Sequence, residues 1–145
     1  MSSPVAAVAA GIQPAGAAAL SSIRTLALVG PATSGKTTLA EALLLKAGVI
    51  QVPGTLERGS TVSDFDALEK RLQHSLNASV MHLTHDATRI HLIDTPGAAD
   101  FVGQSLPALE AVETAAVVIH AAAGIQPMAV RMMAHAAERR LDRLI

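Results

Sequence analysis

The 145-residue sequence has no cysteine, tryptophan or tyrosine, and only two phenylalanines. The absence of cysteine rules out disulfide bonds and thiolate metal sites, which fits a cytoplasmic protein. With so few aromatic side chains, alanine, leucine and valine must fill the core. Basic and acidic residues nearly balance, 11 against 12, so no broad positive surface for DNA is expected. Beyond the first 22 residues there is no apolar run of about 18 or more residues, so we predict no membrane span.

Charged residues are also absent from residues 1–22, which are interrupted by Pro4, Gly11, Pro14 and Gly16. A secretory signal peptide would begin with basic residues. We therefore expect residues 1–22 to form a disordered tail rich in alanine, glycine and proline. Residues 23–145 should form a single domain, which is long enough to bury a core.

The first part of this domain alternates an apolar run with a helical pattern. Thr25–Gly30 is typical of a buried strand that ends in glycine. A helix should follow and stop at Gly48. Its helical spacing is carried by Leu39, Ala42, Leu43 and Lys46. Residues 49–68 show little periodicity and predict a long loop, which in a compact domain is usually functional or mobile.

Residues 79–93 predict a β-hairpin with its turn centred on His85-Asp86. Because side chains alternate along a strand, each face of the hairpin collects its own residue types. One face is then apolar and carries Met81, Leu83, Ile90 and Leu92. The other face carries Val80, His82, Arg89 and His91.

The remaining elements complete an α/β pattern. A helix should begin near residue 106, with Ser105 as its cap and Pro107 in its first turn, leaving residues 97–104 irregular. Ala115–Ala121 predicts another buried strand, and Pro127 begins the last helix. "LDRLI" at the end begins a further apolar segment. This order predicts an α/β sandwich whose sheet is mostly parallel, with one antiparallel hairpin.

The strongest motif is "GPATSGKT", which matches the phosphate-binding pattern G-x-x-x-x-G-K-[ST] and lies between a predicted strand and a predicted helix. Backbone N–H groups must converge on phosphate oxygens, so such a loop turns tightly and needs glycine. Lys36 would reach the terminal phosphates, and the Thr37 hydroxyl would ligate Mg²⁺. The predicted nucleotide-binding residues here are Gly30, Pro31, Ala32, Thr33, Ser34, Gly35, Lys36, Thr37 and Thr38.

A second motif, "DTPG", follows another apolar strand. Asp94 stands where a P-loop nucleoside triphosphatase holds a second acidic residue for Mg²⁺. Pro96 and Gly97 follow, and Gly97 can bring a bare backbone N–H to a γ-phosphate. We therefore predict that Asp94, Pro96 and Gly97 belong to the nucleotide site, with Lys36 and Gly97 as its catalytic groups.

Three motifs in this order resemble the nucleotide-binding domain of translational GTPases: "GPATSGKTT", "DTPGAADF" and "GIQP". The resemblance points to elongation factor G and its divergent elongation factor G-like branch, and covers roughly residues 24–145. It implies a P-loop three-layer sandwich, truncated as a G domain. It also implies GTP or GDP as ligand, Mg²⁺ as cofactor and the ribosome as partner of the intact protein.

Three departures from this family pattern bear on activity. Aligning the family's switch I puts Ser75 where a threonine completes the Mg²⁺ shell, so Ser75 joins Thr37 and Asp94 as a predicted metal ligand. Ala98 replaces the histidine that orients the attacking water, and loss of one such group costs about 10²–10⁴ in rate. The Asn-Lys-x-Asp motif that recognises guanine is missing, so guanine specificity rests on the resemblance. In the resembled fold the strand at Ala115–Ala121 pairs with a further strand, which "LDRLI" only starts, so the resemblance implies that Ala115–Ala121 is an exposed apolar edge.

The histidines offer weaker alternatives. His82, His85 and His91 cluster on the hairpin, but we interpret them as polar-face residues because ligand-type neighbours are scarce, Asp86 excepted. His120 is interpreted as a core residue that bonds backbone, and His74 is kept as a substitute catalytic base.

The sequence therefore predicts a GTP-binding, Mg²⁺-dependent GTPase domain of an elongation factor G-like translation factor, slow in hydrolysis because of Ala98. One alternative is a non-hydrolysing nucleotide-binding module or degenerate fragment, in which bound nucleotide only orders the switches for a partner. Another is a P-loop kinase or ATPase, against which the "DTPG" motif counts.

Overall fold

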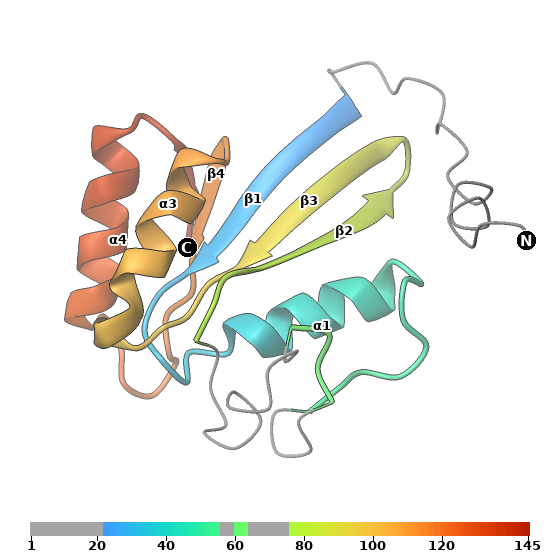
Figure 1. Cartoon of the computed structure of the whole chain (residues 1–145), viewed down its shortest axis with the longest axis horizontal. Helices are drawn as coiled ribbons and strands as arrows, with labels where there is room; N and C mark the ends of the chain where they lie inside the picture. The colour runs from blue at the N-terminus through green and yellow to red at the C-terminus, as the bar shows by residue number, and fades with distance from the viewer. Residues whose placement is uncertain (1–21, 56–59, 64–75) are drawn as a thin grey trace, which may run out of the picture.

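The computed structural model describes residues 22–55, 60–63 and 76–145. A five-stranded sheet lies between two layers of helices (Figure 1). Its strand order is β2-β3-β1-β4-β5. The strands are β1 Ile23–Val29, β2 Ser79–His85, β3 Thr88–Asp94, β4 Thr114–Val117 and β5 Asp142–Leu144. The helices are α1 Lys36–Lys46, α3 Val102–Glu110 and α4 Pro127–Glu138, with a 3₁₀ turn, η5, at Ala99–Phe101.

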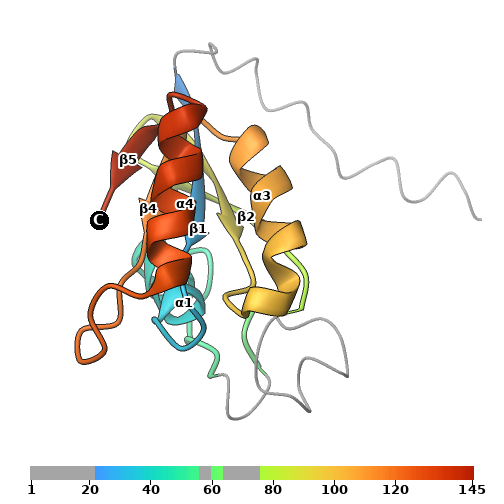
Figure 2. The same ribbon diagram turned by 90° about the vertical axis from the view of Figure 1, so that its left-hand side faces the viewer.

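The predicted α/β sandwich is confirmed. Strand β1 pairs in parallel with β3 and β4, and β4 pairs in parallel with β5; among the strands of the described residues, β2 alone runs antiparallel, against β3. Helix α1 covers one face of the sheet, and α3 and α4 cover the other (Figure 1); Figure 2 looks onto the α3–α4 face, with α1 behind the sheet. None of the helices in the described residues has the length and apolarity that a membrane crossing requires.

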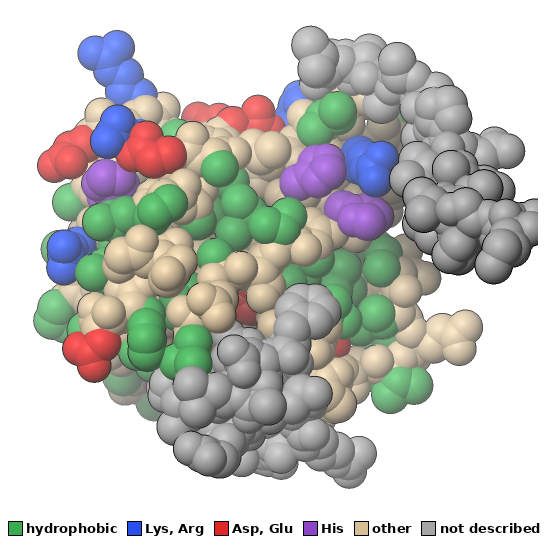
Figure 3. All heavy atoms as spheres, viewed as in Figure 1, with side chains coloured by type: hydrophobic (Ala, Val, Ile, Leu, Met, Phe, Trp, Pro, Cys, Tyr) green, Lys and Arg blue, Asp and Glu red, His purple; other side chains and the backbone are tan. Residues whose placement is uncertain are grey.

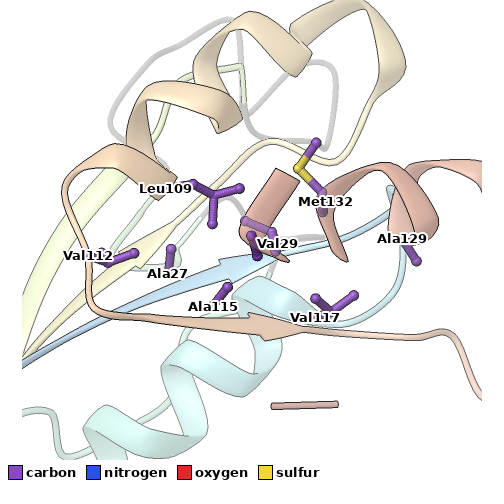
Figure 4. Packing of buried hydrophobic residues seen from close by; sticks show 9 residues of the cluster. Ala27, Val29, Leu109, Val112, Ala115, Val117, Ala129 and Met132 are labelled. Carbon is purple, nitrogen blue, oxygen red and sulfur yellow. The ribbon is translucent and has the colours of Figure 1, made fainter. Parts of the chain in front are cut away.

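Alternation along β1 divides the core between the two faces. Ala27 and Val29 point to the α3–α4 side, whereas Leu28 points to α1. On the first side, the strand residues Ala115 and Val117 pack with Leu109 of α3 and Met132 of α4 (Figure 4). On the second, Leu28 packs with Ala40, Leu44, Met81, Leu83 and Leu92. Aliphatic side chains thus fill both layers, as the composition implied.

The hairpin keeps its predicted faces but turns one residue later. Its turn is Asp86-Ala87, with His85 opposite Thr88, and Asp86 adopts a positive φ of 51°. Moving the turn centre by one residue shifts each cross-strand partner by two, which leaves every side chain on the same face. Met81 therefore faces Leu92 rather than Ile90, and the apolar face is intact. His82 and His91 are register partners on the other face, with ring centroids 6.3 Å apart, and Figure 3 shows histidines side by side on the surface. The prediction is wrong for His85, which lies on the same face as Met81 and Leu83 and lines a pocket with Leu43 and Ile90.

The start of α3 was predicted wrongly. The helix begins at Val102, so Ser105 and Pro107 lie inside it rather than at its cap and first turn. A proline in a helix leaves the carbonyl four residues earlier unbonded, here that of Gly103. Gly103 and Pro107 both face solvent, where water can hydrate that carbonyl. Ser105 is buried and donates a hydrogen bond to the Pro96 carbonyl, 2.9 Å away.

Two further expectations are corrected at β4. The strand ends at Val117 rather than Ala121, because the chain turns at His120, whose Nδ1 accepts hydrogen bonds from two backbone amides. His120 is thus a partly exposed turn residue rather than a core residue, although the predicted bonding to backbone is confirmed. The predicted exposed edge at β4 is also wrong, because β5 pairs with it from Thr114 to Ala116.

The buried face of α1 also differs from the predicted spacing. Leu39 is 40% exposed, and Ala42 and Lys46 are exposed. The buried positions are Lys36, Thr37, Ala40, Glu41 and Leu44. Because Lys36 and Thr37 turn inward at the start of the helix, the residues four positions later turn inward as well.

Candidate functional site

The two motifs meet at the carboxyl edge of the parallel strands. The loop Gly30–Gly35 follows β1, and Thr95–Gly97 follow β3, its neighbour in the sheet. Leu28 and Asp94 are partners in the parallel register. Loops at the carboxyl ends of adjacent parallel strands share one rim, which is where α/β proteins form their binding sites.

The phosphate loop adopts backbone conformations that explain its glycines. Gly30 has a φ of 140°, and a Cβ there would lie 2.4 Å from the Val118 carbonyl oxygen. Gly35, the residue before α1, has a φ of 95°, and Thr33 has a φ of 60°. These left-handed conformations turn the loop tightly and bring it to the positive end of α1, where an anion is favoured.

Lys36 lies at the centre of this loop. Its side chain is buried, and its ammonium donates hydrogen bonds to the carbonyls of Pro31, at 2.7 Å, and Gly30, at 3.1 Å. Burial lowers the pKa of Lys36 from 10.5 to about 8, and the nearby Asp94 carboxylate opposes that shift. The ammonium is thus held among loop carbonyls in an environment that disfavours its charge, and an anionic ligand would relieve this.

The hydroxyl of Ser34 is a second polar group suited to a phosphate. Within the described part of the chain, Ser34 Oγ is buried and has no hydrogen-bond partner. Buried polar atoms are nearly always paired in folded proteins, so an orphan in a phosphate loop indicates a ligand oxygen as its partner.

The oxygen donors expected for Mg²⁺ come together. Thr37 Oγ1 donates a 2.6 Å hydrogen bond to Asp94 Oδ2, across 57 residues of sequence. Both side chains are buried, Asp94 at 1% exposure. One carboxylate and one hydroxyl suit a cation that completes its shell with phosphate oxygens and water. These two residues therefore fit Mg²⁺; the third predicted ligand, Ser75, lies outside the described residues, as do His74 and the tail before Ser22.

Gly97 lies directly against the phosphate loop. A Cβ at Gly97 would come within 2.4 Å of Lys36 Nζ, 2.5 Å of Ala32 N and 2.6 Å of Pro31 C. Only a residue without a side chain can bring its backbone this close to the ammonium and the loop. The structure therefore brings Gly97 beside Lys36, Ala32 and Pro31.

Two hydroxyl side chains that sequence reasoning did not assign to the site hold this segment. Thr95 Oγ1 donates to the Leu28 carbonyl at 2.7 Å, and Ser105 Oγ to the Pro96 carbonyl at 2.9 Å. Thr95 thus ties the segment to β1, and Ser105 ties it to α3. Pro96 is buried between these two anchors. No sequence pattern singled out Thr95, whereas Ser105 was noticed but interpreted as a helix cap.

Ala98 directly precedes the 3₁₀ turn η5. Its backbone is extended, with φ −74° and ψ 140°, and its carbonyl accepts a hydrogen bond from Phe101 N at 3.0 Å. The residue is partly exposed, and its methyl group offers no donor or acceptor beside Gly97.

Comparison with known proteins gives consistent matches. Residues 21–145 match the family described as the elongation factor Tu GTP binding domain. An elongation factor G-like protein of Mycobacterium tuberculosis (strain ATCC 25618 / H37Rv) is 47% identical over 103 residues, which are 71% of this chain and 14% of that protein. Peptide chain release factor 3 of Bordetella petrii is 39% identical over 114 residues, 76% of this chain and 21% of that protein.

Solved structures show the same likeness. A protein from Thermus thermophilus superposes with a TM-score of 0.79 at 42% identity, covering 82% of this chain and 18% of that one. A bacterial selenocysteine-specific elongation factor shares the fold, with a TM-score of 0.64 at 20% identity over 81% of this chain and 18% of that one. The chain spans between 14% and 21% of the length of the relatives named here.

Proposed function

The chain belongs to the elongation factor Tu GTP-binding domain family of translational GTPases, and on this basis we propose that it binds GTP or GDP with Mg²⁺. Within a longer factor of the elongation factor G-like kind, it would hydrolyse GTP on the ribosome, in the cytoplasm. The observation that carries this proposal is the meeting of the two motifs. Thr37 bonds Asp94 at 2.6 Å, and Gly97 packs against Lys36.

The proposed reaction is in-line attack of water on the γ-phosphate, which depends on positioning and charge stabilisation. Backbone N–H groups within Gly30–Thr38, except at Pro31, which has none, would hold the phosphates, with the Ser34 hydroxyl as a further donor. The Lys36 ammonium would exchange its loop carbonyls for phosphate oxygens, and the Gly97 N–H would donate to the γ-phosphate. Because Gly97 now packs against Lys36, the two must separate to admit that phosphate.

Thr37 and Asp94 would hold the metal ion, with Ser75 as a third ligand. Bound Mg²⁺ supplies charge neutralisation on the β- and γ-phosphate oxygens. The residues themselves supply a buried carboxylate and a hydroxyl held in place by α1 and β3. These roles use only oxygen donors, which Mg²⁺ prefers.

Hydrolysis should be slow, because Ala98 has no group that can orient water. The same methyl group favours a second candidate function, a nucleotide-binding module that orders its switches for a partner without hydrolysis. Single-turnover hydrolysis of GTP by the longer protein with ribosomes separates the two. A ribosome-stimulated rate supports the GTPase, and a rate no faster than in free solution supports the module.

Nucleotide binding is tested by calorimetric titration of the chain with a non-hydrolysable GTP analogue, with Mg²⁺ or with EDTA, and with ATP as competitor. We expect Mg²⁺-dependent binding that ATP does not displace. Equal displacement by ATP would favour a P-loop kinase or ATPase instead. No binding of either nucleotide would refute the proposed function.

A further inference from the structure

A buried glutamate on α1 remains outside the site as described. Glu41 is 3% exposed, and each of its carboxylate oxygens accepts one backbone hydrogen bond. Oε2 accepts from Gly54 N at 2.7 Å, and Oε1 accepts from Val62 N at 2.5 Å. Hydrogen bonds from backbone N–H groups to a carboxylate are stronger than those between neutral groups. Glu41 therefore fastens the loop between α1 and β2 to the helix at two points.

Both residues that bond Glu41, Gly54 and Val62, lie in closely packed surroundings. A Cβ at Gly54 would lie 2.3 Å from the Ser60 carbonyl oxygen, so the chain passes itself closely there. Val62 packs into the apolar cluster on the α1 side of the sheet. The next residue, Ser63, is 2% exposed, and its carbonyl accepts a hydrogen bond from Ser79 Oγ at 3.1 Å. The contacts of Glu41 thus continue to the first residue of β2.

This chain of contacts ends on both sides at the proposed metal ligands. Thr37 lies four residues before Glu41, one turn earlier on the same face of α1. Ser79 is the register partner of Asp94 across the β2–β3 pair. Glu41, Val62, Ser63 and Ser79 therefore form a second link between the elements that Thr37 and Asp94 join directly. The loop carbonyls that hold Lys36 belong to residues 30 and 31, which take no part in this link.

We propose that Glu41 is a positioning residue for the metal side of the nucleotide site. By fastening α1 to the loop that leads to Ser79, it keeps Thr37 and Asp94 at the separation that Mg²⁺ requires. This inference rests on the proposed function. It implies that loss of Glu41 weakens the Mg²⁺-dependent part of triphosphate binding and spares the part supplied by Lys36 and the loop amides.

The variant that tests this inference is Glu41→Gln. It keeps the size of the side chain, but one of its two terminal groups becomes an N–H donor that faces a backbone N–H. Loss of one hydrogen bond to a charged group corresponds to about a ten-fold or larger change in an equilibrium. We therefore expect the ratio of the dissociation constants in EDTA and in Mg²⁺ to fall by about ten-fold, with the value in EDTA unchanged.

The full chain is titrated with the non-hydrolysable GTP analogue in both conditions. The matched control is Glu138→Gln, which makes the same substitution at an exposed glutamate of α4 and should bind like wild type. Hydrogen exchange of the Gly54 and Val62 amides is measured in parallel and should accelerate only in Glu41→Gln. Glu41→Asp keeps the charge but shortens the side chain, so its ratio of dissociation constants should lie between those of wild type and Glu41→Gln. It replaces the glutamine variant if that variant fails to fold.

The outcomes separate the two proposals. If wild type binds no nucleotide, the proposed function fails and this inference fails with it. If wild type binds, and the glutamine variant shows faster exchange but an unchanged Mg²⁺ ratio, Glu41 fastens the loop only and the positioning role is refuted. Equal losses in EDTA and in Mg²⁺ would also refute it, because they indicate general damage to the fold.

Discussion

Adding one methyl group at Gly97 should disturb both the fold and the phosphate loop. In Gly97→Ala the new Cβ would lie 2.4 Å from Lys36 Nζ, 2.5 Å from Ala32 N and 2.6 Å from Pro31 C. Ordinary contacts at such a position begin near 3.4 Å, so the neighbours must move by roughly 1 Å. Two of them are loop backbone, and the ammonium is held by the carbonyls of Pro31 and Gly30.

Overpacking of this kind costs about 1–3 kcal/mol. For a chain of this size, 1 kcal/mol corresponds to about 4 °C in melting temperature. Gly97→Ala should therefore melt about 4–12 °C below wild type when circular dichroism is followed on heating. Binding of the GTP analogue should be lost with it, because the methyl group occupies the space between the loop and the proposed γ-phosphate donor.

Gly103→Ala is the matched control. Gly103 lies in α3 with no atom within 4 Å of an added Cβ. Alanine is favoured over glycine in a helix by about 0.5–1 kcal/mol, so this variant should melt about 2–4 °C above wild type and bind nucleotide normally. A Gly97→Ala protein with wild-type melting and wild-type affinity would refute the close packing of Gly97 on the loop.

Three further predictions concern the same site. Lys36→Ala should abolish triphosphate binding in calorimetric titration while leaving the fold intact, because its side chain contacts loop carbonyls rather than the apolar core; retained affinity would contradict the phosphate role. The pKa of Lys36 is about 8 in the unliganded chain, and phosphate requires the charged form. Affinity should therefore fall as pH rises above 8, and binding above that pH should take up protons, measured from heats in buffers of different ionisation enthalpy; buffer-independent heats would exclude this linkage. Ala98→His in the longer protein should raise ribosome-stimulated GTP hydrolysis about ten-fold with little change in GTP affinity; a variant no faster than wild type would show that Ala98 does not limit the rate.

Several features of the fold could be predicted because they depend on local pattern. The period-two alternation of the hairpin assigned Met81 and Leu92 to the buried face, and this survived an error in the turn position. Pro127 was correctly predicted to begin α4, where its missing N–H costs nothing. The start of α3 could not be predicted, because it depends on tertiary packing. Packing leaves Gly103 exposed, so that water can hydrate its carbonyl, and it buries Ser105 against the Pro96 carbonyl.

By itself the sequence determined the family, the α/β order of elements and the two motifs at the strand ends. Such signals are local: glycine permits the backbone turns of a phosphate loop, and apolar periodicity separates strands from helices. It also predicted that Thr37 and Asp94 act at one site, and the structure brings the two into contact across 57 residues.

Only the tertiary structure decided which side chains hold those motifs in place. Each of these side chains bonds a distant backbone group. Thr95 bonds one 67 residues away, and Ser105 bonds one 9 residues away. Glu41 bonds two, which are 13 and 21 residues away. Backbone amides and carbonyls are the same at every residue, so no sequence pattern marks the partner that such a side chain will meet. Their roles follow from the sheet register and helix packing that bring distant segments together, which is why a buried glutamate on α1 became visible only in the folded chain.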